Sequence, residues 1–257
     1  MKNLIGIFIF LCASLVVLSL FVGVSKTKPL PELTELSPYM YNNKNVSIKK
    51  IHVTVFYFIP KDVKEYEISD WKEYVENHLK NLITFHTLQF QNTSEITYTF
   101  SPSYVIGEKD KVEYEGILGS YEDHDALIPI KEEITKRVLT KGGDLYIEKN
   151  NEKQNDIRNV FMVVFEGNGA AGNGDFALIS RKYLTDKEYV NTGSTFLAHE
   201  FYHTLGIPDN YQSSIIVHED KSQSKTSLVT KKDIMGQVNI PLTSTYLDTD
   251  TLKNMGI

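Results

Sequence analysis

The chain has 257 residues, of which 41% are hydrophobic and 23% are charged, with 15 Tyr and 13 Phe. Such a composition belongs to a folded globular protein and excludes a disordered or fibrous chain. A single Cys excludes a disulfide framework, a Cys-rich zinc finger and an iron–sulfur site. A net charge of −6 without a run of basic residues removes nucleic acid from the expected partners.

The first 28 residues indicate the destination of the protein. Residues 4–24 carry no charge, and as a helix they are long enough to cross a hydrocarbon layer of about 30 Å. This run exceeds the apolar region of about 7–15 residues in a cleavable signal peptide, although Gly23 and Ser25 supply small side chains for cleavage. We expect a hydrophobic helix that is a membrane anchor or a signal peptide, with a buried core helix as the remaining alternative. In the first two cases the body is extracytoplasmic, anchored by a single span or secreted, at a bacterial cell surface, where a body without Cys suits oxidising conditions.

Residues 29–50 separate this segment from the first strong strand pattern. They contain three Pro and the polar stretch from Tyr41 to Asn45, which is typical of an irregular linker. We therefore expect a stalk at residues 29–50 and one folded domain at residues 51–257.

The folded domain alternates strand and helix patterns. Residues 51–59 are mostly β-branched and aromatic, which predicts a strand buried on both faces, and residues 95–100 alternate as a second strand. Between them, Asp70 and Glu73 form a capping-box pattern ahead of apolar residues at helical spacing. Another helix is expected to begin near Pro129.

Two further strands complete the predicted sheet. Residues 159–166 predict a deeply buried strand, and residues 176–180 predict a short one. The Gly-rich stretch of residues 167–174 lacks the Gly-Lys-Ser/Thr ending of a phosphate-binding loop, so we expect a flexible turn or a bulge there. This order of strands and helices predicts an α/β (α+β) fold with a mixed, twisted sheet.

The residues with clear chemical potential are concentrated in one helix pattern. Ser194 is a candidate N-cap for a helix over residues 195–205. His199 and His203 are four positions apart, so both rings project from one face at the spacing that a tetrahedral metal requires. Glu200 lies about 100° further round the helix, where it can reach a water on the metal but not bind as a third ligand.

A third ligand is expected shortly after this helix. Gly206 can adopt a positive φ and let the chain leave the helix abruptly, so that Asp209 can return to the metal. A catalytic zinc has three protein ligands and an open position for water, and Asp209 would complete that set. His218 and Glu219 remain alternatives for the third ligand.

The string from His199 to Asp209 resembles the motif of the metzincin-like zinc metallopeptidases, HExxHxxGxx followed by His or Asp. The variant with Asp is similar to the snapalysin type and to the immune-inhibitor-A-like secreted bacterial proteases. This family also has a Met-containing turn beneath the metal, and residues 233–236, with Met235, look like that turn. The resemblance covers residues 194–236 and implies a zincin fold whose active-site helix carries the two His ligands.

One position departs from the family pattern. Some members carry a Tyr two residues after the Met, where it assists the transition state, but this chain has Gln237 there. Tyr211 and Tyr246 are the candidate substitutes among the 15 Tyr of the chain.

Other zinc classes fit the sequence less well. Thermolysin-like enzymes take a Glu ligand from a second helix about 20 residues downstream, where residues 221–226 are polar and loop-like. Intramembrane zinc proteases place the motif inside an apolar span and deformylases use a Cys ligand, and neither feature accompanies this motif.

The sequence thus predicts an exported zinc endopeptidase with a metallopeptidase domain at residues 51–257 and one catalytic Zn²⁺. Glu200 would take a proton from the metal-activated water and deliver it to the leaving amine. A peptide or protein substrate would pair with an edge strand formed by Phe176, Ala177, Leu178, Ile179 and Ser180. We expect a monomer. Two alternatives are a non-catalytic binding module stabilised by zinc and a zinc hydrolase of a non-peptide amide.

Overall fold

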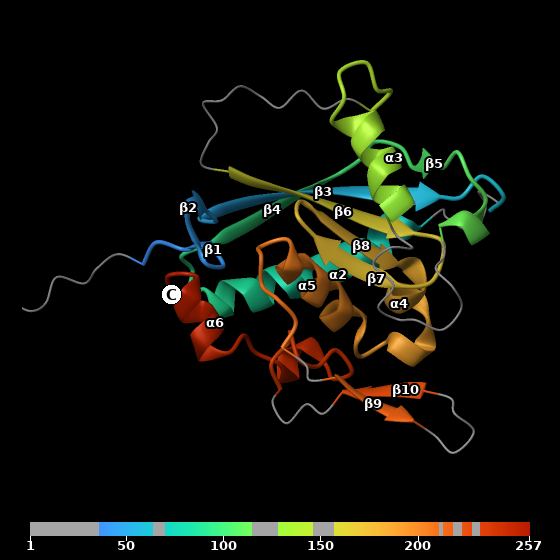
Figure 1. Ribbon diagram of the computed structural model, residues 1–257. Coiled ribbons are helices and arrows are strands. Elements are labelled where there is room, and N and C mark those ends of the chain that lie inside the picture. Colours follow the sequence, from blue (N-terminus) through green and yellow to red (C-terminus); the bar gives the residue numbers. More distant parts are fainter. Residues whose placement is uncertain are drawn as a thin grey trace, which may run out of the picture. The chain divides into compact units, whose positions relative to one another are not determined.

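The computed structural model describes residues 36–63, 70–114, 128–145, 157–210, 213–217, 223–227 and 232–257 (Figure 1). The apolar run at residues 4–24 lies outside these ranges, as do Tyr211, His218 and Glu219. None of the helices in the described ranges combines the length and apolar character that a membrane span requires. The membrane anchor or signal peptide therefore stays a prediction.

A mixed six-stranded sheet is the centre of the domain (Figure 1). Its strands are β3 (Lys50–Ile59), β4 (Glu95–Phe100), β5 (Val105–Ile106), β6 (Ile157–Phe165), β7 (Ala170–Asn173) and β8 (Phe176–Ser180). The main order is β4-β3-β6-β8-β7, and β5 pairs with the end of β3. All pairs are parallel except β7 with β8, which is antiparallel. The α/β class and the mixed sheet are confirmed.

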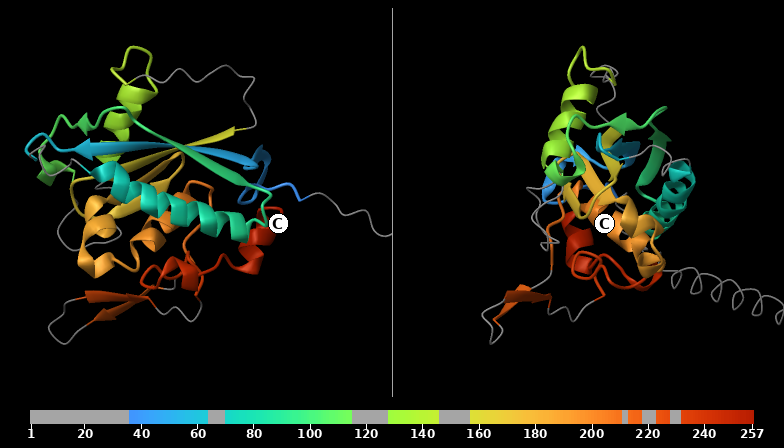
Figure 2. Two further views of the ribbon diagram at one scale, coloured as in Figure 1. Left: turned by 180° about the vertical axis from the view of Figure 1, so that it is seen from behind. Right: turned by 90° about the vertical axis from the view of Figure 1, so that its right-hand side faces the viewer.

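Helices cover both faces of the sheet, which explains the continuous apolar runs in its central strands. Helices α2 (Trp71–Gln89) and α5 (Gly193–His203) lie on one face and α3 (Ile128–Val138) lies on the other (Figures 1 and 2). Alternate side chains of β3 serve the two cores. Val53 and Val55 belong to the core with α2 and α5, whereas Phe56 and Phe58 belong to the core with α3.

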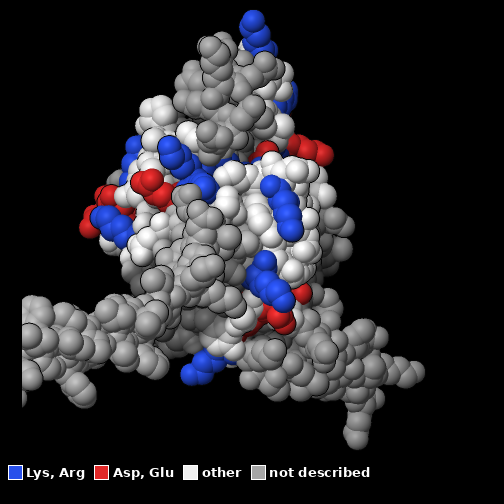
Figure 3. All heavy atoms as spheres, turned by 90° about the vertical axis from the view of Figure 1, so that its left-hand side faces the viewer, with Lys and Arg blue, Asp and Glu red and all other residues white. Residues whose placement is uncertain are grey.

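Shorter elements surround this framework. They are β1 (Tyr39–Met40), β2 (Asn43–Ser47), α4 (Arg181–Thr185), β9 (Ser213–Val217), β10 (Gln223–Ser227), α6 (Thr249–Asn254) and the 3₁₀ turns Lys111–Glu113, Lys187–Tyr189 and Leu242–Ser244. Strands β9 and β10 pair as an antiparallel hairpin where the sequence had indicated a polar loop. On the face shown in Figure 3, Lys and Arg side chains are interspersed with Asp and Glu over largely uncharged surface.

Three local expectations were wrong. Helix α5 begins at Gly193 after Thr192, so Ser194 is inside the first turn, where its hydroxyl contacts His78 Nδ1 at 2.8 Å. Asp70 precedes α2 but makes no side-chain capping bond. The Gly-rich stretch contains strand β7, because its backbone pairs with β8 over four residues.

Part of the expected stalk is folded. The compact unit extends from Leu36 to Ile257, and β1 and β2 lie within it. Backbone bonds join this segment to distant parts of the chain, from the Tyr39 amide to the Met255 carbonyl and from the Tyr41 amide to the Leu205 carbonyl, each at 3.0 Å. The sequence did not predict these strands, because they lack an apolar pattern and their pairing depends on backbone bonds.

A buried histidine joins α2 to α5. His86 is fully buried, with Nε2 2.8 Å from Ser94 Oγ and Nδ1 3.3 Å from Tyr202 Oη. Ser94 Oγ donates to the Ile48 carbonyl, so His86 donates from Nε2 and accepts at Nδ1, as a neutral ring does. Burial lowers the pKa of His86 to about 3.

The folded segment before β3 is expected to contribute to stability. Ile48 is fully buried, so Ile48→Ala should lower the free energy of unfolding by about 2–5 kcal/mol through loss of core contacts. The exposed neighbour substitution Lys49→Ala should change it by less than about 0.5 kcal/mol. Urea unfolding followed by circular dichroism measures both, and equal stabilities would show that this segment does not belong to the core.

His86 should make the protein less stable in acid. Its pKa is lower in the folded state than the ordinary value of 6.5, so unfolding takes up a proton below pH 6.5. Its contribution is present above that pH and should decline by about 2 kcal/mol between pH 7 and pH 5. Urea unfolding of the metal-free protein at both values, compared with His86→Gln, isolates this part. Parallel pH profiles for the two proteins would contradict the assignment of a neutral His86.

Candidate metal centre

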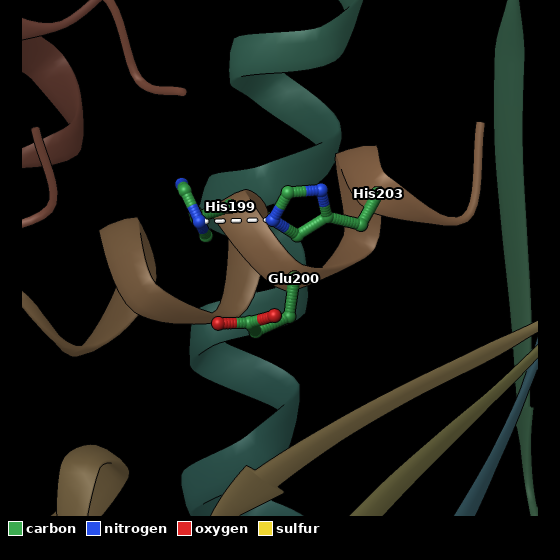
Figure 4. Close-up of side chains that lie close together, drawn as sticks. All are labelled: His199, Glu200 and His203. Carbon is green, nitrogen blue, oxygen red and sulfur yellow. Dashed lines mark hydrogen bonds between the residues drawn. The ribbon is translucent and has the colours of Figure 1, made fainter. Parts of the chain in front are cut away.

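Helix α5 places two imidazoles against each other (Figure 4). The rings of His199 and His203 are perpendicular, with centroids 4.6 Å apart, and their Nε2 atoms are separated by 3.1 Å. His199 is buried, and the side chain of His203 is only 10% exposed. The spacing of one helical turn thus brings two nitrogen ligands together, as the sequence predicted.

The end of α5 returns the chain to these nitrogens. Gly206 has φ +85°, and its amide donates to the His203 carbonyl at 3.0 Å, so the helix stops in a left-handed turn. Asp209 follows three residues later. Its Oδ1 lies 3.1 Å from Nε2 of His199 and 3.2 Å from Nε2 of His203. A sharp turn at Gly206 therefore brings the carboxylate to the same point as the two rings.

The three atoms form a triangle of metal-binding size. Ligands about 2.0–2.1 Å from a tetrahedral zinc lie roughly 3.3 Å from one another. The observed separations of 3.1, 3.1 and 3.2 Å are close to this value. A single ion can therefore touch all three atoms at once.

Hydrogen bonds to the other ring nitrogens make both Nε2 atoms available as ligands. His199 Nδ1 lies 2.9 Å from the Ile234 carbonyl, and His203 Nδ1 lies 2.8 Å from the Ile207 carbonyl. A carbonyl oxygen only accepts, so each Nδ1 carries the hydrogen and each neutral ring has its lone pair at Nε2. Two nitrogen lone pairs and one carboxylate oxygen then converge, and a cation resolves their mutual repulsion. The residues present fit a metal ion.

The electrostatics of the cluster agree with a preference for positive charge at its centre. Burial lowers the pKa of His199, but the bond to Asp209 and the charge of Glu200 outweigh it, so the net shift is upward. Burial raises the pKa of Asp209, but the bonds from His199 and His203 outweigh it and hold that pKa well below its usual range. A metal ion would take the place of a proton in this cluster.

Glu200 lies next to the two histidines but points away from the line between them (Figure 4). It is buried, and one of its carboxylate oxygens lies within 4.8 Å of ligand atoms of both His199 and His203. The carboxylate is therefore at the site without sharing the triangle formed by the other three groups. This arrangement suits a proton-transfer group beside a metal.

The turn at residues 233–236 borders the site. The amides of Gly236 and Gln237 both donate to the Asp233 carbonyl at 3.0 Å, and Met235 is fully buried. Ile234, inside this turn, supplies the carbonyl that orients His199. The structure thus brings the predicted Met-containing turn to helix α5.

Two contacts hold the end of α5 in place. Arg158 Nη2 donates to the Thr204 carbonyl at 2.9 Å, and the Tyr41 amide donates to the next carbonyl, that of Leu205. These carbonyls belong to the C-cap residue of α5 and to the residue after it, where the helix itself supplies no donor. The cation of Arg158 at this end also complements the helix dipole.

Gly172 is a site-forming residue that sequence reasoning missed. A Cβ at this position would lie 2.2 Å from the Glu200 carbonyl oxygen and 2.6 Å from Cβ of His203. Strand β7 can therefore approach α5 only because residue 172 has no side chain. The run of Gly at residues 167–174 is the sequence signal for this close approach, but it does not single out position 172.

The expected substrate strand is not an edge. Strand β8, with Phe176, Ala177, Leu178, Ile179 and Ser180, is paired on both sides and all five residues are buried. It therefore has no free backbone groups for a substrate, and β7 is the last strand on this side of the described sheet. Tyr246 lies beside the 233–236 turn, since its amide donates to the Lys232 carbonyl, and its side chain is 39% exposed.

The comparisons with known proteins give weak likenesses. No protein-family model matches the chain, and no curated protein sequence matches it. Metalloproteinase-II from Bacteroides fragilis is 13% identical, with a TM-score of 0.38, and the match covers 86% of this chain. This chain spans 57% of the length of that metalloproteinase. The Argonaute protein from Methanocaldcoccus janaschii in complex with guide DNA is 10% identical, with a TM-score of 0.28, covering 72% of this chain and 24% of its own.

Neither TM-score defines a shared fold, so the class of the protein rests on the site itself. The chain carries a His-Glu-x-x-His cluster on a helix packed against a mixed sheet, and this cluster can hold a metal ion. That combination defines a candidate metal centre.

Crowding at Gly172 should be damaging to the metal site. Gly172→Ala forces β7 and α5 apart, so zinc affinity should fall at least about 10-fold as the ligand triangle is distorted. Gly142→Ala is the matched control, because φ there is +98° but no atom lies within 4 Å of the new Cβ. It should cost about 1 kcal/mol in stability and leave zinc affinity unchanged. Competition with a chromogenic chelator measures the affinities, and equal affinities for both variants would contradict this account.

Proposed function

We propose that this protein is a zinc-dependent endopeptidase. His199, His203 and Asp209 would hold the metal, and Glu200 would be the general base. The observation that carries the proposal is the triangle of three ligand atoms 3.1–3.2 Å apart, with a buried carboxylate beside it. Three protein ligands leave a fourth position open, as a catalytic zinc requires and a structural one does not.

The side chains divide the chemical work. Bound zinc would supply Lewis acidity, which polarises a substrate carbonyl and makes a water acidic near neutral pH. Glu200 is close enough to the ligand atoms to accept a proton from that water. The same carboxyl group can then give the proton to the amine that leaves when the peptide bond breaks. His199 and His203 keep their orientation throughout, because their Nδ1 atoms remain bonded to backbone carbonyls.

Strand β7 is the proposed partner for an extended peptide substrate. It is the last strand of the described sheet beside β8, and it packs against α5 at the level of Glu200 and His203. A peptide paired with its outer edge would run past the metal-binding helix. This choice replaces β8 and favours peptide substrates over small amides, because a small amide cannot use a strand edge. The substrate would be an extracytoplasmic protein or peptide.

Glu200→Gln should separate metal binding from catalysis. The variant should keep one zinc per chain and the wild-type thermal midpoint, while cleavage of casein falls at least about 100-fold. Glu132→Gln, an exposed Glu on α3 at the other face of the sheet, is the matched control and should cleave normally. Near-normal cleavage by Glu200→Gln would show that this carboxyl is not the base.

The ligand assignment is tested in the same assays with alanine variants. Asp209→Ala should lose zinc on dialysis against a weak chelator and lose cleavage with it. His218→Ala and Glu219→Ala should retain both. Loss of zinc from either of these two, with retention in Asp209→Ala, would place the protein in another zinc class. Zinc binding without cleavage of any peptide in a library would favour a binding module, or a hydrolase of non-peptide amides.

A further inference from the structure

A buried carboxylate outside the ligand set connects the turn at residues 233–236 to the loop of the third ligand. Asp233 is 1% exposed. Its Oδ2 accepts a bond from Asn210 Nδ2 at 2.9 Å, and its Oδ1 accepts a bond from the Met235 amide at 3.2 Å. Burial, together with the neighbouring Asp248 carboxyl, raises the pKa of Asp233, and the bonds from Asn210 and Met235 oppose this rise.

Asn210 provides a second connection in the opposite direction. Its amide donates to the Met235 carbonyl at 2.8 Å, while its side chain donates to Asp233. Asn210 directly follows Asp209 in the chain. Two bonds from one residue therefore fix the position and the rotation of the backbone that carries the third ligand.

The same turn also orients a ligand from the helix. Ile234 lies between Asp233 and Met235, and its carbonyl accepts the bond from His199 Nδ1 at 2.9 Å. A displacement of the turn would consequently rotate His199 as well as move Asp209. Asp233 is thus bonded to the residue after Asp209 and adjoins the residue whose carbonyl orients His199.

We infer that Asp233 and Asn210 form a positioning pair, which sets the geometry of the metal site by holding Asp209 and the carbonyl partner of His199 together. This inference rests on the proposed function for the presence of the metal. Neither residue touches the metal or the substrate. Their effect is on how tightly, and with what geometry, the metal is held.

The contacts allow this role to be separated from a contribution to folding. Asp233 also interacts with Asp248, whose Oδ1 accepts a bond from the Thr251 amide at 2.9 Å and caps α6. Asp233→Asn removes a charge that faces this second carboxyl, so the fold should tolerate it. A neutral amide has one oxygen, however, and it cannot reproduce the two separate acceptor sites that Asn210 and Met235 use.

Exchanging the two side chains should restore the pair. In the double variant Asn210→Asp with Asp233→Asn, the amide nitrogen at position 233 can donate to the carboxylate at position 210. The amide oxygen at position 233 remains for the Met235 amide. The backbone bond from position 210 to Met235 is unaffected by either substitution.

The experiment compares four full-length proteins, which are the wild type, Asp233→Asn, the exchanged double variant and the control Asp250→Asn. Zinc affinity is measured by chelator competition, coordination geometry by the visible absorption spectrum of the Co²⁺-substituted protein, and fold stability by thermal unfolding without metal.

Asp233→Asn should weaken zinc binding about 10- to 100-fold and change the Co²⁺ spectrum. The exchanged variant should recover at least half of the lost affinity on a logarithmic scale, together with the spectrum. Asp250→Asn removes an exposed carboxyl from the first turn of α6 and should leave affinity and spectrum unchanged, because no bond joins its side chain to Asp233 or Asn210.

The outcomes distinguish this inference from the proposed function. If the wild type binds no zinc, the proposed function fails and the inference fails with it. If the wild type binds zinc and Asp233→Asn has the same affinity and the same Co²⁺ spectrum, only the positioning pair is refuted. Loss of affinity in Asp233→Asn without recovery in the exchanged variant would also refute the pair.

Discussion

The mutual repulsion of three electron-rich atoms is the constraint on which the rest of the structure depends. Nε2 of His199, Nε2 of His203 and Oδ1 of Asp209 lie 3.1–3.2 Å apart in a largely buried place. Left alone, these groups would turn away from one another or take up a proton. Each is instead prevented from moving by a bond on its far side, or by the backbone that follows it. Much of the domain can be understood as the support for this unfavourable convergence.

That support comes from three directions. The sheet sets the position of α5, since β7 approaches the helix closely at Gly172 and the cores on both faces of the sheet are apolar. The end of the helix is held by Arg158 and by the segment before β3. The 233–236 turn supplies the carbonyl that orients His199. Rigid surroundings of this kind suit catalysis, because a preorganised site does not have to be rearranged during each reaction.

The sequence predicted the features that are encoded locally. The strands at residues 51–59, 95–100 and 176–180 were predicted from their apolar patterns, and the helix near Pro129 from its start signal and spacing. The two His ligands could be paired because four residues make one helical turn, and Asp209 because a Gly allows the chain to reverse.

The features that the sequence did not predict depend on residues far apart in the chain. Strand β7 has the sequence Ala-Ala-Gly-Asn, which has little preference for a strand, and it is imposed by β8 and α5. Gly172 and Asp233 owe their importance to α5 and to Asn210, which no local pattern reveals.

The bonds of β1 have a consequence for the order in which the domain can form. Tyr39 of β1 bonds to Met255, and Tyr41, directly after β1, bonds to Leu205, so one short segment closes two very large loops of chain. Contacts between residues so distant in sequence carry a high entropic cost and are typically made late in folding. A chain that is still being synthesised can form α5, with its two imidazoles side by side, before residue 255 is available to bond with β1. The segment that borders the end of α5 is therefore fixed at Met255 only after α6 has been made.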